Sequence, residues 1–323
     1  MSYSVAIRTL GINKSQLKEL IQDLFGQTVK PDKILIFIAE NYPIPNFRVE
    51  NEAYICVKKG MMKQRLLPYD DVSSESLLML DDDVKMQPDS VEKLLEAMVK
   101  HNADLVGADT FQNHRLPIRA KIWAAITNLV FPHFSQKWAF KIHRNGSFSY
   151  LNDPRESFYW SQSCAGNAML WKKSSYDALK MRDELWLDGF PFAYGDDMLE
   201  TFKVYKNGMK LGVVFNSGIK HLDCKSASGL YHNSSDKIKT RTMSQLAVWW
   251  RTCFRPGGSG FFTQFFAACA FLVKITWLFC GFLTLSLVKF DFSYISYFVN
   301  GLFEGWKFVH SKAFTSIPPY VIR

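Results

Sequence analysis

Leu77-Leu78-Met79-Leu80-Asp81-Asp82-Asp83-Val84 joins a short apolar run to three consecutive aspartates, and the expected architecture is built around this stretch. Four apolar residues in a row predict an interior strand of a parallel sheet, because such a sheet is covered on both faces. Ligands bind in the crevice beyond the carboxyl ends of these strands. Three adjacent carboxylates repel one another, so we expect a cation there. Hard oxygen ligands suit Mn²⁺ or Mg²⁺ together with a phosphorylated ligand.

An ordinary helix start is the alternative interpretation of these acids. Pro88-Asp89-Ser90-Val91-Glu92 opens a helical pattern, and acidic side chains favour helix N-termini. This accounts for Asp89 and Glu92 but not for three acids before Val84. We therefore favour a metal site.

Strand and helix patterns alternate around this stretch over the first hundred residues. Strand patterns occur at 5–7, 34–39 and 54–57, and helical patterns occur at 15–25, where Ser15 can cap the helix, and at 91–99. This βαβ rhythm predicts an α/β protein with a half-sheet of the nucleotide-binding type. We place a catalytic domain at 1–245, with a nucleotide-binding half at 1–110 and an acceptor half at 111–245, followed by a C-terminal helical region at 246–323.

The charge of the chain is concentrated near its C-terminus. The 39 Lys and Arg exceed the 30 Asp and Glu by nine, and from Lys220 to Arg323 there are 12 basic and 4 acidic residues, an excess of eight. Basic charge beside apolar segments predicts contact with an anionic membrane surface. No basic helix, finger spacing or RNA-binding aromatic signature appears, so we expect no nucleic-acid partner.

The cysteines and the N-terminus indicate the compartment. The six cysteines form no CxxC pair, which argues against zinc and against a disulfide framework and favours a reducing cytosol. The first residues lack a basic region followed by a long apolar stretch, so we expect no signal peptide. The catalytic part is therefore expected in the cytoplasm.

A long apolar segment, Phe261–Val288, has 21 apolar residues among 28 and Lys274 as its one charge. Its length permits a bilayer crossing. A lysine near the middle of a lone spanning helix costs about 2.5–3.5 kcal/mol, however. With Gly281 as a place to bend, we expect a helix or hairpin that dips into one leaflet, although a single span stays open. Basic residues expected near the head groups are Arg251, Arg255 and Lys289.

The next segment has an amphipathic pattern typical of an interfacial helix. Its apolar face and its polar face lie opposite each other. The alternative is a soluble C-terminal subdomain that buries these apolar faces internally. The apolar face comprises Ile295, Phe298, Leu302, Trp306 and Val309, and the polar face comprises Asn300, Glu304, Lys307 and Ser311.

A second acid pair, Asp196-Asp197, precedes a helical pattern that closes at Asn207-Gly208. Asp196 could cap this helix, which would leave Asp197 free to accept a proton from a hydroxyl nucleophile. His221 follows a predicted strand at 211–215. It is either a structural histidine or a contact to metal or phosphate.

Two further segments have compositions that would suit a cover over the site. Aromatic and basic residues interleave between Phe111 and Trp160, with a helical pattern at 120–130, and this segment either covers the site or packs on the core. Residues 224–240 either fold over a diphosphate or form an ordinary solvated loop.

These motifs, in this order, resemble glycosyltransferases of the GT-A fold, family 2, and specifically the galactofuranosyltransferase- and rhamnosyltransferase-like enzymes of polysaccharide biosynthesis. The resemblance runs from about Tyr3 to Asp223. It implies a Rossmann-like mixed sheet flanked by helices. Asp81-Asp82-Asp83 looks like the DxD motif, so Asp81 and Asp83 would hold the metal and the donor, beside Asp82. His221 matches a histidine often found on the metal.

The resemblance also implies how the donor and the acceptor are handled. Further donor-binding residues would be Thr9, Glu40 and Arg65. Ser163-Cys164-Ala165-Gly166-Asn167-Ala168 resembles the glycine-bearing loop near the sugar and the acceptor, which assigns Gly166 and Asn167 to it. Asp196-Asp197 occupies the Glu-Asp position, so Asp197 would be the catalytic base of an inverting reaction, with Asp196 on the acceptor side.

Two departures from the family pattern stand out. Arg8-Thr9-Leu10-Gly11-Ile12-Asn13 replaces the usual Pro-Thr-aromatic-Asn, so only Thr9 carries over, and Asp196 replaces a glutamate. The resemblance and the membrane-like C-terminus together predict a metal-dependent glycosyltransferase at the cytoplasmic face of the cell membrane. Its donor would be a nucleotide-diphosphate sugar, with a UDP-sugar favoured, and its acceptor lipid-linked or a polysaccharide.

Two alternatives belong to other classes. A non-catalytic membrane adaptor could retain the fold, although the aspartates argue against it. A sugar-nucleotide nucleotidyltransferase would need a Gly-rich loop and a lysine near the first strand, but Gly11 is the one glycine among residues 8–14.

Overall fold

The computed structural model describes residues 1–46, 52–110, 122, 131–133, 135–191, 193–222 and 234–322. The first half of the chain has, in order, β1 (Tyr3–Thr9), α1 (Lys14–Phe25), β2 (Ile34–Ala39), β3 (Glu52–Val57), β4 (Ser76–Asp81), β5 (Val84–Lys85), α2 (Ser90–His101), β6 (Leu105–Ala108), β7 (Phe131–His133), β8 (Phe140–Ile142), β9 (Phe148–Leu151) and β10 (Phe158–Trp160). The second half has β11 (Ala168–Lys172), α4 (Lys173–Ala178), the 3₁₀ segment η1 (Met181–Gly189), α5 (Asp196–Lys206), β12 (Leu211–Val214), β13 (Lys220–His221), α6 (Ser234–Trp249), the π-helical turn η3 (Trp250–Phe254), α7 (Phe261–Lys289), α8 (Ser293–Val309) and α9 (Lys312–Thr315).

An eight-stranded mixed sheet forms the centre of the molecule, in the order β10-β12-β6-β11-β4-β1-β2-β3. The expected strands at 5–7, 34–39, 54–57 and 77–80 are all confirmed. The apolar run 77–80 is an interior strand, as predicted. The sheet is not wholly parallel, because β4 pairs with β1 in parallel and with β11 antiparallel.

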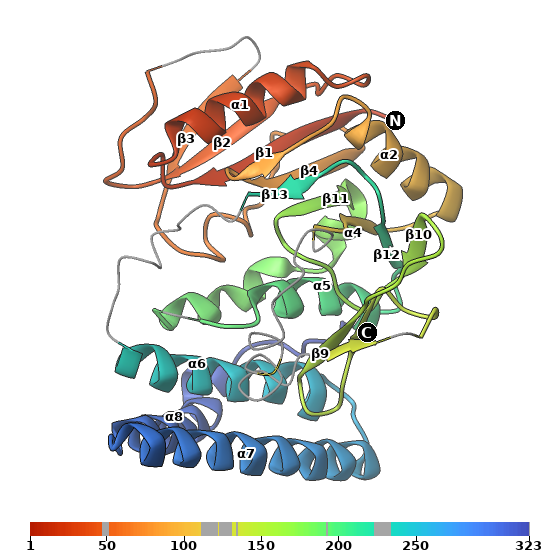
Figure 1. Ribbon diagram of the computed structural model, residues 1–323. Helices are drawn as coiled ribbons and strands as arrows, with labels where there is room; N and C mark the ends of the chain where they lie inside the picture. The colour runs from red at the N-terminus through yellow and green to blue at the C-terminus, as the bar shows by residue number, and fades with distance from the viewer. Residues whose placement is uncertain are drawn as a thin grey trace.

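The alternation of side chains along the strands creates a core on each face of the sheet. In β2, Ile34, Ile36 and Ile38 join the core under α1 and α2, whereas Leu35 and Phe37 join the core on the other side, which extends to α5 and α6. Figure 1 shows α1 and α2 beside the sheet, with α5 and then α6 beneath it. Both faces are therefore covered, as the continuous apolar strands require.

Local expectations for two helix starts are wrong. Ser15 does not cap α1, because Asn13 occupies the cap position and the Ser15 hydroxyl bonds the Gln16 side chain instead. Asp196 does not cap α5 either. Gly195 takes the cap position with a φ of +93°, a backbone conformation that glycine adopts without a steric penalty, and Asp196 is the first helical residue.

The C-terminal region differs from its prediction in three respects. Helix α7 runs unbroken through Gly281, so neither the bend nor the hairpin forms. Arg251 is buried and contacts Glu184 at 2.7 Å, so it does not lie near head groups. In α8 the buried face contains Phe298, Gly301, Gly305 and Val309, whereas Trp306 is exposed.

The segments that were expected to cover the site lie only partly within the described residues. Helix α6 includes position 245, and the division into domains stays a prediction. Residues 234–240 belong to this helix rather than to a loop, and 224–233 lie outside the described residues. Apart from position 122, the helical pattern at 120–130 also lies outside them.

Candidate active site

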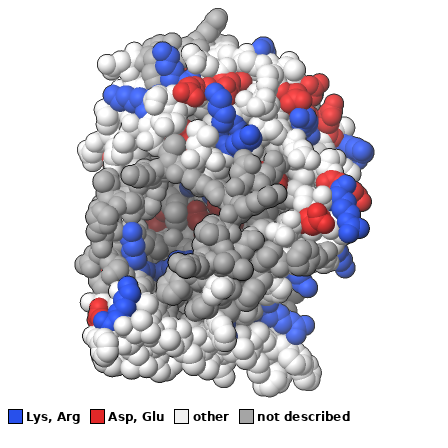
Figure 2. All heavy atoms as spheres, viewed as in Figure 1, with Lys and Arg blue, Asp and Glu red and all other residues white. Residues whose placement is uncertain are grey.

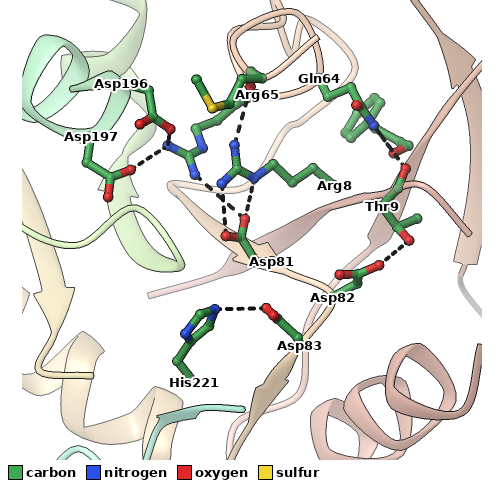
Figure 3. A network of polar contacts seen from close by, with 12 residues as sticks. Arg8, Thr9, Gln64, Arg65, Asp81, Asp82, Asp83, Asp196, Asp197 and His221 are labelled. Atoms are coloured by element: carbon green, nitrogen blue, oxygen red, sulfur yellow. Dashed lines mark hydrogen bonds and ion pairs between the residues drawn. The ribbon is translucent and has the colours of Figure 1, made fainter. Parts of the chain in front are cut away.

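The three aspartates lie at the carboxyl end of β4, and each has a different partner (Figure 3). Asp81 forms a two-point ion pair with Arg8 of the neighbouring β1, in which Arg8 Nη2 lies 2.9 Å from Asp81 Oδ2. The register of the two strands places Arg8 directly opposite Asp81. The Thr9 hydroxyl donates a hydrogen bond to Asp82. Thr9 thus lies at the aspartates, as predicted.

His221 joins the site through a short strand pairing. Strand β13 pairs antiparallel with β5, which sets His221 opposite Val84. His221 Nε2 lies 3.1 Å from Asp83 Oδ1, and the Leu222 N–H donates to the Asp83 carbonyl at 2.8 Å. A histidine 138 positions away from Asp83 is thereby held against its carboxylate.

Arg65 connects the two groups of acids. Its Nη1 lies 3.0 Å from Asp197 Oδ1 and 3.8 Å from Asp196 Oδ2, while its Nη2 lies 3.6 Å from Asp81 Oδ1. The Arg65 side chain is only 3% exposed, so its guanidinium is shielded from solvent. The aspartates of β4 and those at the start of α5 therefore share one site, as Figure 3 shows.

The loop before β11 forms another wall of the site. A Cβ atom built on Gly166 would overlap Asp197 Oδ1 and reach 2.5 Å from Arg65 Nη1, so any side chain at this position would displace Asp197 or Arg65. The Asn167 carbonyl accepts from the Asp81 N–H at 3.1 Å, and its side-chain amide donates to the Thr110 hydroxyl at 3.1 Å. Gly166 and Asn167 are thus brought to the two acid groups.

Burial and neighbouring charges shift the pKa values of the site carboxyl groups in different directions. Burial alone would raise the pKa of Asp81, but the Arg8 guanidinium holds it below its usual value. Burial raises the pKa of Asp82 to about 6. For Asp196, burial and the adjacent Asp197 raise the pKa to about 6. Asp81 is thus ionised, whereas Asp82 and Asp196 bind protons near pH 6.

Two site residues were not predicted from the sequence. Arg8 is the partner of Asp81, and Glu200 lies 3.2 Å from Arg65 Nη1 with no exposed surface. Burial raises the pKa of Glu200 to about 7 against the opposing charge of Arg65. Both had a sequence signal, since Arg8 ends an apolar strand next to Thr9 and Glu200 lies one helical turn after Asp196.

Glu40 is not brought into this network. It follows β2 and is exposed, and its backbone N–H donates to the Val57 carbonyl at 2.7 Å. Its role near the base or ribose stays a prediction.

The predicted metal ligands meet only in part. Among the described residues, no three His, Cys, Asp or Glu side chains cluster as a metal site, because Asp81 is turned to Arg8 and away from the Asp83–His221 pair. A carboxylate oxygen and an imidazole nitrogen are nevertheless suitable donors for Mn²⁺. Asp83 and His221 fit a cation whose other ligands come from a bound diphosphate.

A pocket of about 210 Å³ adjoins Asp196 and Asp197. The β8–β9 hairpin forms one wall with Phe140 and Phe148, and α6 contributes Val248. The lining is mostly apolar and aromatic. Such a surface can receive the apolar face of a sugar ring, while the carboxylates contact its hydroxyl groups.

Comparison with known proteins agrees with this geometry. A protein-family model, the glycosyl transferase family 64 domain, matches residues 3–129. The structure of S. aureus TarS 1–349 in complex with UDP-GlcNAc superposes with a TM-score of 0.57 at 12% identity, covering 97% of this chain and 83% of that one. The chain has the GT-A glycosyltransferase fold. The family match and the fold together support a glycosyltransferase.

Other comparisons are more distant. The structure of GalNAc-T7 with UDP, GalNAc and Mn²⁺ superposes with a TM-score of 0.50 at 11% identity. The match covers 85% of this chain but only 56% of the GalNAc-T7 chain. No curated protein sequence matches. The matching family model describes family 64, so neither family 2 nor the galactofuranosyltransferase-like subgroup is confirmed.

Proposed function

We propose that the protein transfers a sugar, with inversion, from a nucleotide-diphosphate donor to a lipid-linked or polysaccharide acceptor at the cytoplasmic face of a membrane. The observation that carries this proposal is the Arg65 bridge between Asp81 and Asp197. It puts a donor-side carboxylate and a candidate base on opposite sides of one guanidinium. A donor bound at β4 would therefore present its sugar to α5.

The donor side can hold a diphosphate. The guanidiniums of Arg8 and Arg65 carry two positive charges next to Asp81, and guanidinium forks bind phosphate oxygens well. Asp83 and His221 would hold Mn²⁺ or Mg²⁺, which would neutralise charge on the departing nucleotide diphosphate. The TarS and GalNAc-T7 structures contain UDP-GlcNAc and UDP, respectively, and these support a UDP-sugar as the donor.

The acceptor side can supply a base. The Asp197 side chain is 43% exposed at the pocket, and Arg65 fixes one of its oxygens at 3.0 Å. A carboxylate held in this way can take the proton of an acceptor hydroxyl as that oxygen attacks the anomeric carbon. General-base catalysis of this kind contributes roughly 10²–10⁴-fold to a rate. Tight packing of Gly166 against Asp197 restricts how the carboxylate can move.

The test begins with ligand binding. UDP and GDP, each with Mn²⁺ or Mg²⁺, should raise the unfolding temperature of the wild type, and Asp83→Ala should weaken that stabilisation. No stabilisation by any nucleotide would favour a non-catalytic adaptor instead.

The second step measures transfer of labelled sugar from nucleotide sugars to a membrane extract. Asp197→Asn should lower turnover by roughly 10²–10⁴-fold while nucleotide binding persists. Asp89→Asn is the matched control, because Asp89 also lies at a helix start but is exposed and pairs with Lys93. Full activity of Asp197→Asn would remove Asp197 from its role as the base.

A further inference from the structure

Helix α7 has two different faces between Ala267 and Ser286. The buried face includes Ala267, Phe271, Lys274 and Leu278, which recur every three or four residues. The opposite face is apolar and open to solvent. Its exposed side chains are Phe261, Phe262, Phe265, Phe266, Leu272, Val273, Trp277, Phe279, Leu287 and Val288.

The β8–β9 hairpin and α6 cover the middle of the buried face. Lys274 Nζ lies 3.3 Å from the Asn145 carbonyl of the β8–β9 hairpin and is only 2% exposed. Phe271 stacks on Trp249 of α6 with ring centroids 3.8 Å apart. The indole N–H of Trp249 donates to the Arg144 carbonyl of the same hairpin at 2.9 Å. The helix therefore packs lengthwise against the β8–β9 hairpin and α6.

This docking is incompatible with α7 crossing a bilayer. A spanning α7 would carry the hairpin and its charged Arg144 into the hydrocarbon layer, where loop backbone exposed to lipid is not tolerated. An α7 that lies parallel to the surface keeps the hairpin in water and buries only the apolar face. Length and composition alone permit a span, so the position of the hairpin is decisive.

Charge indicates what covers the apolar face. Between positions 234 and 322 there are nine Lys and Arg, of which Arg251 and Lys274 are buried, and three Asp and Glu. Arg255 precedes α7, Lys289 ends it, and Arg144 lies over the Phe266 ring at 5.3 Å. The band where Figure 1 places α7 and α8 is almost free of charge on the face shown in Figure 2. An apolar, aromatic strip bordered by cations matches an anionic lipid surface better than a second copy with the same cations.

We propose that α7 lies flat in the interfacial layer of an anionic phospholipid bilayer, with its exposed face toward the acyl chains, and does not span it. This orientation also indicates which acceptor the pocket receives, an inference that rests on the proposed function. Gly146 lines the pocket beside Asp197, and its neighbour Asn145 contacts Lys274 of α7. The pocket and the membrane-facing helix thus share the hairpin, which favours a lipid-linked acceptor over a free polysaccharide.

Two natural cysteines make the orientation measurable. Cys269 and Cys280 are exposed on α7 and lie eleven residues apart, which is about three turns, so both point in nearly the same direction. In a background with Cys56→Ser and Cys224→Ser, one of these two cysteines is replaced by serine and the other is spin-labelled. Immersion depth is then measured by power saturation with oxygen and a water-soluble nickel complex on phosphatidylcholine–phosphatidylglycerol vesicles. Ile12→Cys, exposed on the sheet side, provides the aqueous reference.

A flat helix gives the same depth for both labels, while the Ile12→Cys label stays in water. Depths that differ by about 16 Å, the axial separation of the two residues, would mean that α7 spans the bilayer and would overturn the proposal. Labels that stay accessible to the nickel complex on vesicles would also overturn it, because another protein or a second copy would then cover the face. Equal binding to vesicles without phosphatidylglycerol would refute the requirement for anionic lipid.

A matched pair of variants tests the surface without labels. Val273→Glu on α7 should weaken vesicle binding at least tenfold, whereas Val99→Glu on α2 should not, although both valines are exposed. Equal binding by the two variants would contradict the assignment of the face. None of these measurements requires sugar transfer, so failure of the proposed function and failure of the orientation are distinguishable.

Discussion

Replacing Arg65 by methionine should destabilise the protein and abolish transfer for two separable reasons. Arg65 Nη1 contacts Glu200 at 3.2 Å and Asp197 at 3.0 Å, and the guanidinium is almost completely buried. Removing one partner of a buried ion pair leaves a charge without compensation, which costs about 3–5 kcal/mol. We expect Arg65→Met to lower the free energy of unfolding by this amount at pH 8, above the pKa of Glu200, measured by urea denaturation with tryptophan fluorescence.

A second substitution separates stability from catalysis. In Arg65→Met/Glu200→Met the buried anion is also removed, so the double variant should recover most of the lost stability. Transfer should stay absent, because Asp197 has lost the group that holds its carboxylate. Nucleotide binding should weaken as well, since Arg65 also lies 3.6 Å from Asp81.

Lys85→Met is the control for the loss of a cation. Lys85 also contacts two carboxylates, Glu19 at 3.5 Å and Asp23 at 3.2 Å, but its side chain is 44% exposed. Exposed pairs of this kind contribute about 0–1 kcal/mol, so the loss should be small. Our account of the buried network is refuted if Arg65→Met costs no more than Lys85→Met, or if the double variant is less stable than Arg65→Met alone.

Three further predictions concern the same site. Gly166→Ala should reduce turnover strongly, because the new Cβ collides with Asp197, and transfer assays with Asp89→Asn as reference check this. Burial raises the pKa of Glu200 to about 7, so the folded protein keeps a proton that the unfolded chain has lost above about pH 4.5. The contribution of Glu200 to the free energy of unfolding therefore falls as the pH rises from 5 to 8. Urea denaturation at a series of pH values should show a decrease of up to about 3 kcal/mol that is absent in Glu200→Gln. Val248→Phe fills the pocket and should raise the KM for acceptor without weakening nucleotide binding; an unchanged KM would show that the acceptor does not use this pocket.

Much of the fold could be predicted because its signals are local. Continuous apolar runs at 34–39 and 77–80 predict interior strands, and they form β2 and β4 with those bounds extended by at most one residue at either end. The helix that closes at Asn207 is also local, since its C-terminal signal lies within a few residues. The start of the same helix was predicted less well. A glycine with positive φ took the cap position that the side chain of Asp196 was expected to fill.

Most residues of the candidate site, though not Arg8 and Glu200, were predictable, whereas their contacts were not. The aspartates, Gly166, Asn167 and His221 were all named from short motifs. Their partners are set by strand register and by the reach of long side chains, as when Arg8 pairs with Asp81 across β1 and β4. The predicted cation among the three aspartates competes with this guanidinium for Asp81, and nothing in the local sequence indicates that competition.

For this chain, local order along the sequence was enough to specify the strands at 5–7, 34–39, 54–57 and 77–80 and the positions of the acids that follow the last of them, because side-chain periodicity acts over a few residues. Three matters depended on how distant segments pack: the union of the two acid groups through Arg65, the burial of Glu200 and the docking of α7 on the β8–β9 hairpin. Hydropathy measures how poorly a segment dissolves in water. It does not show whether protein or lipid covers each face of a helix. The packing of the folded chain determines which face is covered by protein.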